Sequence, residues 1–334
     1  MKIDKVVVTG AAGYIGAHIC HELLAQGFDV IAIDDLSTGR QEFLKPGIAF
    51  FQGKVQDKPF LIDVFSNLKT PESTGVIHCA GFKFAGESVK HPIAYYENNT
   101  SAVQVLLEVM AEFSIQSLVF SSSSSVYGSL KKLQAVPESA ELNPVSPYGR
   151  SKLFAELMIF DAIATSSLKA VALRYFNVAG NSPGIGFDTS PFNLMPNLYR
   201  AISTKKEFTV FGGDFDTPDG SCIRDYVDVS VLARAHIIAL QKLMAGGDLN
   251  FAYNLGSGSG ASVLEIVSTA KRIIDSDLKT VIVEARRGDP AQILADDSLA
   301  RQDLGWRHQV SLEDMLLSGW MAWNSATGKQ IVAD

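Results

Sequence analysis

The sequence has 334 residues, of which 47% are hydrophobic and 19% are charged. This composition is typical of a folded globular protein and excludes disordered, collagen-like and fibrous classes. The 29 Lys and Arg residues stand against 36 Asp and Glu residues, which gives a formal net charge of −7. A net negative charge disfavours binding to nucleic-acid phosphates, so we expect no nucleic-acid partner.

The cysteines and the apolar runs indicate the compartment. Cys20, Cys79 and Cys222 are too few and too scattered for the disulfide framework of a secreted domain. The apolar run at residues 6–8 is too short for the core of a signal peptide, and no run approaches the roughly 18 apolar residues of a membrane span. We therefore expect a cytoplasmic protein with no membrane partner.

Short apolar runs alternate with segments of helical spacing along the first half of the chain. The expected strands are residues 6–8, 29–34, 75–80, 117–121 and 169–175, and the main expected helices are residues 15–26, 99–113 and 148–165. This alternation predicts an α/β fold with a doubly wound parallel sheet of the Rossmann type.

The pattern changes after Phe176, where Gly, Pro, Asn and Asp become frequent. We expect a loop over residues 180–191, helices over 227–243 and 262–274, and a strand at 253–255. The sequence thus predicts a dinucleotide-binding domain over residues 1–176, completed by segments around 227–255. A smaller mixed α/β lobe over residues 177–334 would bind mainly the substrate and interleave with the first domain.

A glycine-rich turn follows the first expected strand. Gly10, Gly13 and Gly16 form a G-x-x-G-x-x-G pattern that opens a helix, whose free N–H groups favour a pyrophosphate. Asp34 ends the next strand, where a carboxylate accepts hydrogen bonds from an adenosine ribose. Asp34 and Asp35 would repel a 2′-phosphate, so we expect NAD rather than NADP.

Tyr148 and Lys152 stand four residues apart at an expected helix start, after Pro147. Bringing the pKa of a tyrosine from about 10 to near 7 requires about 4 kcal/mol of preferential phenolate stabilisation. A desolvated lysine and an oxidised nicotinamide could supply it together. This pair alone is common by chance, but the serine run 121–125 lies at the carboxyl end of an expected strand, where ligands bind in such sheets.

A pair of histidines in the first expected helix could indicate a metal site, but this is the weaker interpretation. His18 and His21 share a helix face, but they match no zinc motif and belong to the helix of the glycine-rich turn. We therefore expect no metal.

The serine run followed by Val126-Tyr127-Gly128, together with residues 146–152 (SPYGRSK), resembles the extended short-chain dehydrogenases/reductases that act on nucleotide sugars. Within them the sequence is most similar to the UDP-glucose 4-epimerase family. Further matches in the family's order are residues 80–83 (AGFK), 86–89 (GESV), 95–99 (YYENN), 174–177 (RYFN), 193–196 (NLMP), 224–227 (RDYV) and 286–290 (RRGDP).

The resemblance implies an NAD-dependent isomerase that interconverts UDP-glucose and UDP-galactose. The sugar would be oxidised at C4 to a 4-keto intermediate, rotate, and be reduced again on its other face. Tyr148 would be the base, Lys152 would bind the nicotinamide ribose and lower the tyrosine pKa, and Ser123 would complete the catalytic set.

The expected cofactor and substrate residues form two sets. The cofactor set is Gly10, Gly13, Tyr14, Ile15, Gly16, Asp34, Asp35, Ser37, Lys54, Val55, Cys79, Ala80, Gly81, Lys83, Asn98, Tyr148, Lys152 and Phe176. The substrate set is Lys83, Ser123, Tyr148, Asn177, Asn193, Leu194, Thr209, Val210, Phe211, Arg224, Arg286, Asp289 and Ile293.

Three positions depart from the family pattern. Lys54 stands where an acid usually faces the adenine, Asp228 stands where His is usual, and Ile293 occupies the position that borders the pocket for an N-acetyl group. Ile293 therefore predicts a preference for UDP-galactose over UDP-N-acetylgalactosamine, without absolute exclusion.

Other functions remain open at this point. A 4-epimerase of UDP-N-acetylglucosamine or UDP-glucuronate would carry a similar serine segment. A nucleotide-sugar 4,6-dehydratase needs an extra acid/base pair, and residues 122–125 hold no carboxylate. A non-catalytic NAD-binding regulator would not need Ser123, Tyr148 and Lys152. The resemblance further implies a homodimer that packs through the helices near 99–113 and 148–165.

Overall fold

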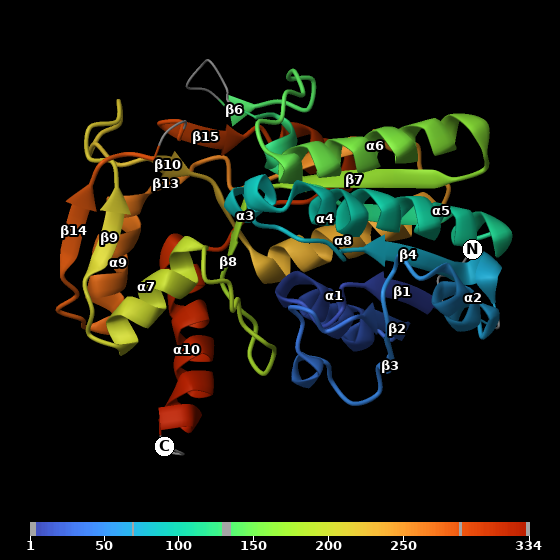
Figure 1. Cartoon of the computed structure of the whole chain (residues 1–334), viewed down its shortest axis with the longest axis horizontal. Coiled ribbons are helices and arrows are strands. Elements are labelled where there is room, and N and C mark those ends of the chain that lie inside the picture. The colour runs from blue at the N-terminus through green and yellow to red at the C-terminus, as the bar shows by residue number, and fades with distance from the viewer. Residues whose placement is uncertain (1–4, 69, 129–134, 287–288, 332–334) are drawn as a thin grey trace.

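A computed structural model describes residues 5–68, 70–128, 135–286 and 289–331, and its centre is a seven-stranded parallel sheet. The strand order is β12-β7-β5-β4-β1-β2-β3, in which neighbouring strands pair in parallel (Figure 1). The strands are β1 Lys5–Thr9, β2 Asp29–Asp34, β3 Ala49–Gln52, β4 Thr74–His78, β5 Ser117–Ser121, β7 Lys169–Tyr175 and β12 Ala252–Leu255. The expectation of a doubly wound α/β sheet is confirmed.

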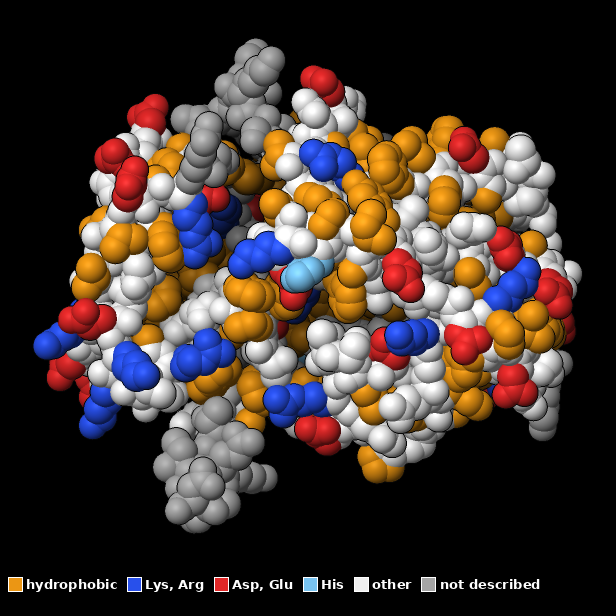
Figure 2. Space-filling model, viewed as in Figure 1, with side chains coloured by type: hydrophobic (Ala, Val, Ile, Leu, Met, Phe, Trp, Pro, Cys, Tyr) orange, Lys and Arg blue, Asp and Glu red, His pale blue; other side chains and the backbone are white. Residues whose placement is uncertain are grey.

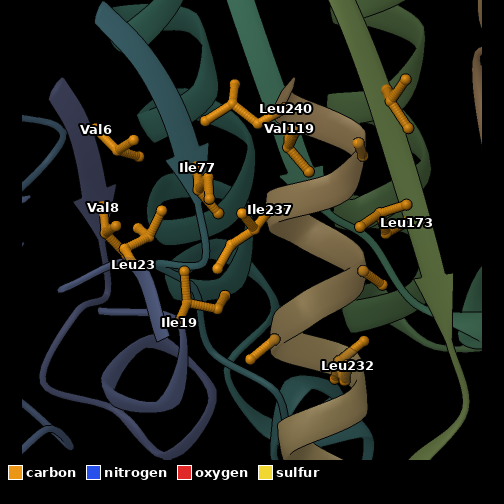
Figure 3. Packing of buried hydrophobic residues seen from close by; sticks show 14 of the residues in the cluster. Val6, Val8, Ile19, Leu23, Ile77, Val119, Leu173, Leu232, Ile237 and Leu240 are labelled. Carbon is orange, nitrogen blue, oxygen red and sulfur yellow. The ribbon is translucent and has the colours of Figure 1, made fainter. Parts of the chain in front are cut away.

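Alternate residues of each strand supply the two faces of this sheet. Val6 and Val8 pack on one side with α1 (Tyr14–Ala25) and α8 (Val229–Met244), as Figure 3 shows for Ile19, Leu23, Ile237 and Leu240. Val7 packs on the other side with α2 (Lys58–Ser66), α5 (Ala102–Glu112) and α6 (Pro147–Thr165). Full burial of each large apolar side chain stabilises the fold by about 1.5–3 kcal/mol.

Short strands and three helices build a smaller lobe beside the sheet, on the left in Figure 1. One sheet has the order β13-β10-β15-β6, and two pairs are β11-β8 and β14-β9. Their strands are β6 Ala135–Val136, β8 Asn177–Ala179, β9 Phe208–Phe211, β10 Ile223–Arg224, β11 Tyr226–Asp228, β13 Ala261–Ser262, β14 Thr280–Val283 and β15 Gln292–Ala295. The helices are α7 Leu194–Ser203, α9 Val263–Ile274 and α10 Leu312–Ile331, and their buried residues share a third apolar cluster.

Several expected boundaries were wrong. The helix expected from residue 227 begins at Val229, because residues 226–228 form β11 and the Asp228 carboxylate caps the helix by accepting from the N–H groups of Ser230 and Val231. The helix expected over 99–113 is α5, and the π-helical turn Tyr96–Ser101 and the short helices α3 (Ala85–Lys90) and α4 (Pro92–Tyr95) precede it. Strand β4 ends at His78, two residues before the expected end. Within the described part of the chain, no helix has the length and apolar character needed to cross a membrane.

Candidate active site

The glycine-rich turn brings backbone into direct contact with backbone. Gly10 has a φ of +66°, and a Cβ placed on it would lie 2.6 Å from the backbone nitrogen of Ala80. A Cβ on Gly16 would lie 2.1 Å from the carbonyl oxygen of Gly10, so both positions require glycine. Gly13 precedes the first residue of α1, and it provides no side-chain cap for the free N–H groups there. This cradle fits a pyrophosphate group at the helix N-terminus.

Asp34 is fixed at the end of β2 by the same turn. Its carboxylate accepts from the backbone N–H of Ala12 at 3.0 Å and from that of Leu36 at 2.8 Å. Burial raises the pKa of Asp34 above its usual value, and the two N–H groups oppose that effect. Asp35 is more exposed and accepts from the backbone N–H of Ser37 at 2.9 Å.

A cavity of about 530 Å³ extends from the glycine cradle to the start of α6. Every residue of the expected cofactor set lines it except Phe176, which packs in an apolar cluster with Val126 and Tyr127. Lys54 and Val55 are part of the lining, so the lysine that departs from the family pattern faces the cavity. Figure 2 shows Lys and Arg side chains gathered beside the hollow between the sheet domain and the smaller lobe.

The start of α6 presents Tyr148 and Lys152 to this cavity. The hydroxyl of Ser146 caps the helix by accepting from the N–H of Gly149 at 3.1 Å, and Pro147 occupies the first turn. Tyr148 is 8% exposed and Lys152 is 4% exposed. The Lys152 ammonium donates to the carbonyl oxygen of Ser121 at 2.8 Å. The Ser123 side chain lies close enough to Tyr148 to lower the pKa of its hydroxyl, so the three expected catalytic residues lie together.

The pKa values of this group follow mainly from burial. Burial raises the pKa of Tyr148, and the hydrogen bond with Ser123 only partly opposes it. The predicted lowering of the Tyr148 pKa requires the oxidised nicotinamide together with Lys152, so it stays a prediction. Burial lowers the pKa of Lys152 to about 8, while Cys79 and Glu156 act in the opposite direction.

A second group of expected substrate residues lies in the smaller lobe, outside the lining of the cavity. The Arg286 guanidinium lies 3.9 Å from the ring centroid of Phe211. The Arg224 guanidinium lies 4.0 Å from the Asp289 carboxylate, and Arg224 pairs with Ile293 across β10 and β15. These residues are brought together from three segments of the chain.

The other expected substrate residues are more scattered. Thr209 and Val210 precede Phe211 on β9, and the Val210 side chain is fully buried in the core of the lobe, so only its backbone could face a ligand. Asn193 directly precedes α7, Leu194 is its first residue, and Asn177 begins β8.

The structure adds cavity residues that sequence reasoning missed. Asp188 accepts from the Lys83 ammonium at 3.2 Å and from the Asn193 amide at 2.6 Å, so it joins an expected cofactor residue to an expected substrate residue. It lies in the expected loop and belongs to no motif. Tyr95 and Glu87 also line the cavity, and the Tyr95 hydroxyl donates to Glu87 at 2.8 Å. Both lie within the segments that carry the resemblance, which was the available signal.

The two histidines of α1, His18 and His21, have backbone groups as hydrogen-bond partners. Nδ1 of His18 lies 2.7 Å from the carbonyl oxygen of Tyr14, and Nε2 accepts from the N–H of Ser182 at 3.1 Å. Nε2 of His21 lies 2.9 Å from the carbonyl oxygen of Phe43. Among the residues with a described position, no three His, Cys, Asp or Glu side chains are grouped as metal ligands.

Known proteins resemble this chain over nearly its full length. Residues 6–256 match the model of the NAD dependent epimerase/dehydratase family. A UDP-glucose 4-epimerase from Lactobacillus helveticus is 40% identical over 321 residues, which cover 95% of this chain and 96% of that protein.

Solved structures agree with these sequence matches. A UDP-glucose 4-epimerase from Stenotrophomonas maltophila, solved with NAD and a formylated UDP-arabinopyranose, has a TM-score of 0.91 at 36% identity and covers 98% of this chain and 99% of its own. The enzyme from Bifidobacterium longum, solved with NAD+ and UDP, has a TM-score of 0.87 at 36% identity and covers 97% and 99%. The glycine cradle, the buried tyrosine and lysine, and these full-length similarities together show that the chain belongs to the NAD dependent epimerase/dehydratase family.

Proposed function

We propose that this protein interconverts UDP-glucose and UDP-galactose by inverting C4 of the hexose with a bound NAD. The observation that carries the proposal is that Tyr148 and Lys152 line a cavity that begins at a dinucleotide cradle, with Ser123 beside Tyr148. The full-length similarity to UDP-glucose 4-epimerases supports the same activity.

NAD would lie along the expected cofactor residues, between the glycine cradle and Tyr148, and would supply a reversible two-electron acceptor for C4. In this assignment the Tyr148 phenolate accepts the proton of the sugar O4 and later returns it. Ser123, which lies beside Tyr148, would hold the same O4 hydroxyl of the sugar. Lys152 places a buried ammonium beside the ribose and favours the phenolate. Because the acceptor is used and regenerated in each turnover, no net redox change occurs.

The uridine diphosphate would lie in the smaller lobe. Arg224 and Arg286 supply cations that fork onto phosphate oxygens, and the ring of Phe211 supports Arg286. In this assignment residues 1–176 with α8 and β12 hold the cofactor, and the rest of residues 177–334 hold the nucleotide sugar.

The test is a comparison of substrates with purified protein. UDP-galactose, UDP-N-acetylgalactosamine and UDP-galacturonate should be assayed side by side, and the denatured protein should be analysed for released NAD. We expect conversion of UDP-galactose to UDP-glucose without added cofactor. Preferred turnover of UDP-galacturonate would reassign the substrate. A 4-keto-6-deoxy product would indicate a dehydratase, and bound NAD without any turnover would indicate a regulator.

We also propose that the protein is a homodimer that packs through α5 and α6. Phe154, Leu157 and Phe160 lie three residues apart on α6 and are 44%, 51% and 55% exposed, which leaves an apolar stripe for a second copy to cover. Sedimentation should give a dimer for the wild type and a monomer for Leu157→Glu. The matched control is Phe192→Glu, because Phe192 is 61% exposed and lies outside both helices. A dimeric Leu157→Glu variant would contradict this interface.

We assign the protein to the cytoplasm. Cys20, Cys79 and Cys222 are free thiols, which suits a reducing compartment. Cell fractionation followed by immunodetection tests the assignment, and recovery from an extracellular or periplasmic fraction would contradict it.

A further inference from the structure

A buried ion pair lies directly behind the expected catalytic residues. Glu156 is one helical turn after Lys152 on α6 and is 2% exposed. Arg174, on the neighbouring strand β7, donates from Nε to Oε1 of Glu156 at 3.0 Å and from Nη2 to Oε2 at 2.6 Å. Burial opposes the charge of Arg174, but its hydrogen bonds and attraction to Glu156 outweigh that effect and raise the pKa of the guanidinium. The pair is therefore a doubly hydrogen-bonded unit inside the domain.

The same carboxylate holds the serine run. The Ser122 hydroxyl donates to Oε1 of Glu156 at 2.5 Å, and Ser122 directly precedes Ser123. Nη1 of Arg174 donates to the Tyr127 hydroxyl at 3.0 Å, which fixes the far end of the segment that follows β5. Glu156 thus connects the segment that carries Ser123 to the helix that carries Tyr148 and Lys152.

Glu156 also sets the electrostatic environment of Lys152. The groups facing the buried ammonium are Cys79 and His78 on the β4 side and Glu156 on its own helix. Burial raises the pKa of Cys79 to about 11 and lowers that of His78 to about 3, so both are neutral near pH 7. Of these three groups, Glu156 is the one that brings a formal negative charge.

We propose that Glu156 is a positioning residue for the epimerase reaction. Held by Arg174, it fixes the Ser123 segment against α6 and presents its negative charge to the Lys152 ammonium. The proposal rests on the roles given above to Ser123, Tyr148 and Lys152. A purely structural ion pair would stabilise the fold without affecting how the reaction depends on pH.

The first test is Glu156→Gln, which keeps the shape and an acceptor for Ser122 but removes the charge. Loss of a charge that favours the ammonium should lower the pKa of Lys152 below its present value of about 8. We therefore expect the alkaline limb of kcat against pH to move to lower pH and kcat at pH 8 to fall on the order of tenfold. KM for UDP-galactose should change little, because Glu156 is buried behind the site.

Two further variants separate positioning from stability. Glu156→Gln/Arg174→Met removes both buried charges, so it should regain most of the thermal stability that Glu156→Gln loses, yet it should keep the shifted pH profile. Ser122→Ala breaks only the link to the serine run, so it should lower kcat several-fold without moving the alkaline limb. The matched control is Glu313→Gln, because Glu313 forms an exposed ion pair with Arg272 at 2.6 Å; its profile should equal that of the wild type.

The outcomes distinguish this proposal from the proposed function. An inactive wild type refutes the epimerase assignment. An active wild type whose pH profile is unchanged in both Glu156 variants refutes the positioning role alone. Recovery of the wild-type profile in the double variant also refutes it, because the effect would then come from the unpaired Arg174. If Glu156→Gln does not fold, the double variant supplies the profile.

Discussion

Replacing Ile293 with Ser should let the sugar site accept an N-acetylated hexose more readily. Ile293 lies on β15 and packs against the cluster that contains Val126, Tyr127 and Phe176, which adjoins the serine run. Side chains alternate along a strand, so Leu294 points to the opposite face, where its Cδ2 would lie 2.4 Å from a Cβ on Gly260. The structure therefore places Ile293, rather than Leu294, on the face that packs toward the segment after the serine run.

The expected size of the effect follows from the groups removed. Serine lacks the outer carbons of isoleucine, and one or two crowded methyl groups in an apolar pocket discriminate by about 1–3 kcal/mol. The wild type should thus prefer UDP-galactose to UDP-N-acetylgalactosamine by roughly 10- to 200-fold, and Ile293→Ser should narrow that ratio mainly by improving the acetylated substrate. Because Ile293 is only partly buried, its loss should also destabilise the fold by about 1–3 kcal/mol, less on average than the loss of a fully buried isoleucine.

The assay is kcat/KM for both sugars, with Leu294→Ser as the matched control. Leu294 is also partly buried on the same strand, so its variant should lose comparable stability but keep the wild-type ratio. An unchanged ratio in Ile293→Ser would refute the reasoning. The same narrowing in both variants would refute it too, since general loosening of the strand would then be the cause.

Three further predictions concern the expected catalytic, cofactor and nucleotide residues. Tyr148→Phe should lower kcat by about 10²–10⁴ while NAD content stays unchanged, because the ring still packs against Tyr95 and only the base is lost; near-normal turnover would exclude Tyr148 as the base. Asp34→Ala should lower the amount of NAD released on denaturation and improve NADP binding, because the carboxylate at the end of β2 is lost. An unchanged preference for NAD over NADP would show that Asp34 does not face the ribose. Arg286→Ala should raise KM for the UDP-sugar by roughly 10- to 150-fold, because a charge-assisted contact of about 1.5–3 kcal/mol is lost, and NAD content should not change. A fall in NAD content with an unchanged KM would place Arg286 at the cofactor.

Local sequence patterns determined the main strands, the glycine-rich turn and the helix start that carries Tyr148 and Lys152. Strands β2, β5 and β7 have the expected bounds, because their apolar runs are continuous and end at turn-forming or polar residues. The glycine-rich turn could also be predicted, since a Cβ at Gly10 or Gly16 would collide with nearby backbone. The Tyr148 and Lys152 pair could be placed because the two residues stand four apart near a capped helix start.

Contacts between distant segments decided the rest. Asp188 joins Lys83 to Asn193 across the cavity, and Glu156 joins Arg174 to Ser122, yet neither acid stands in a pattern that marks it. The burial of Tyr148, which raises its pKa, likewise follows from the fold and not from any local pattern. Burial and pairing of polar groups depend on which segments the sheet order brings together, and that order is a property of the whole fold.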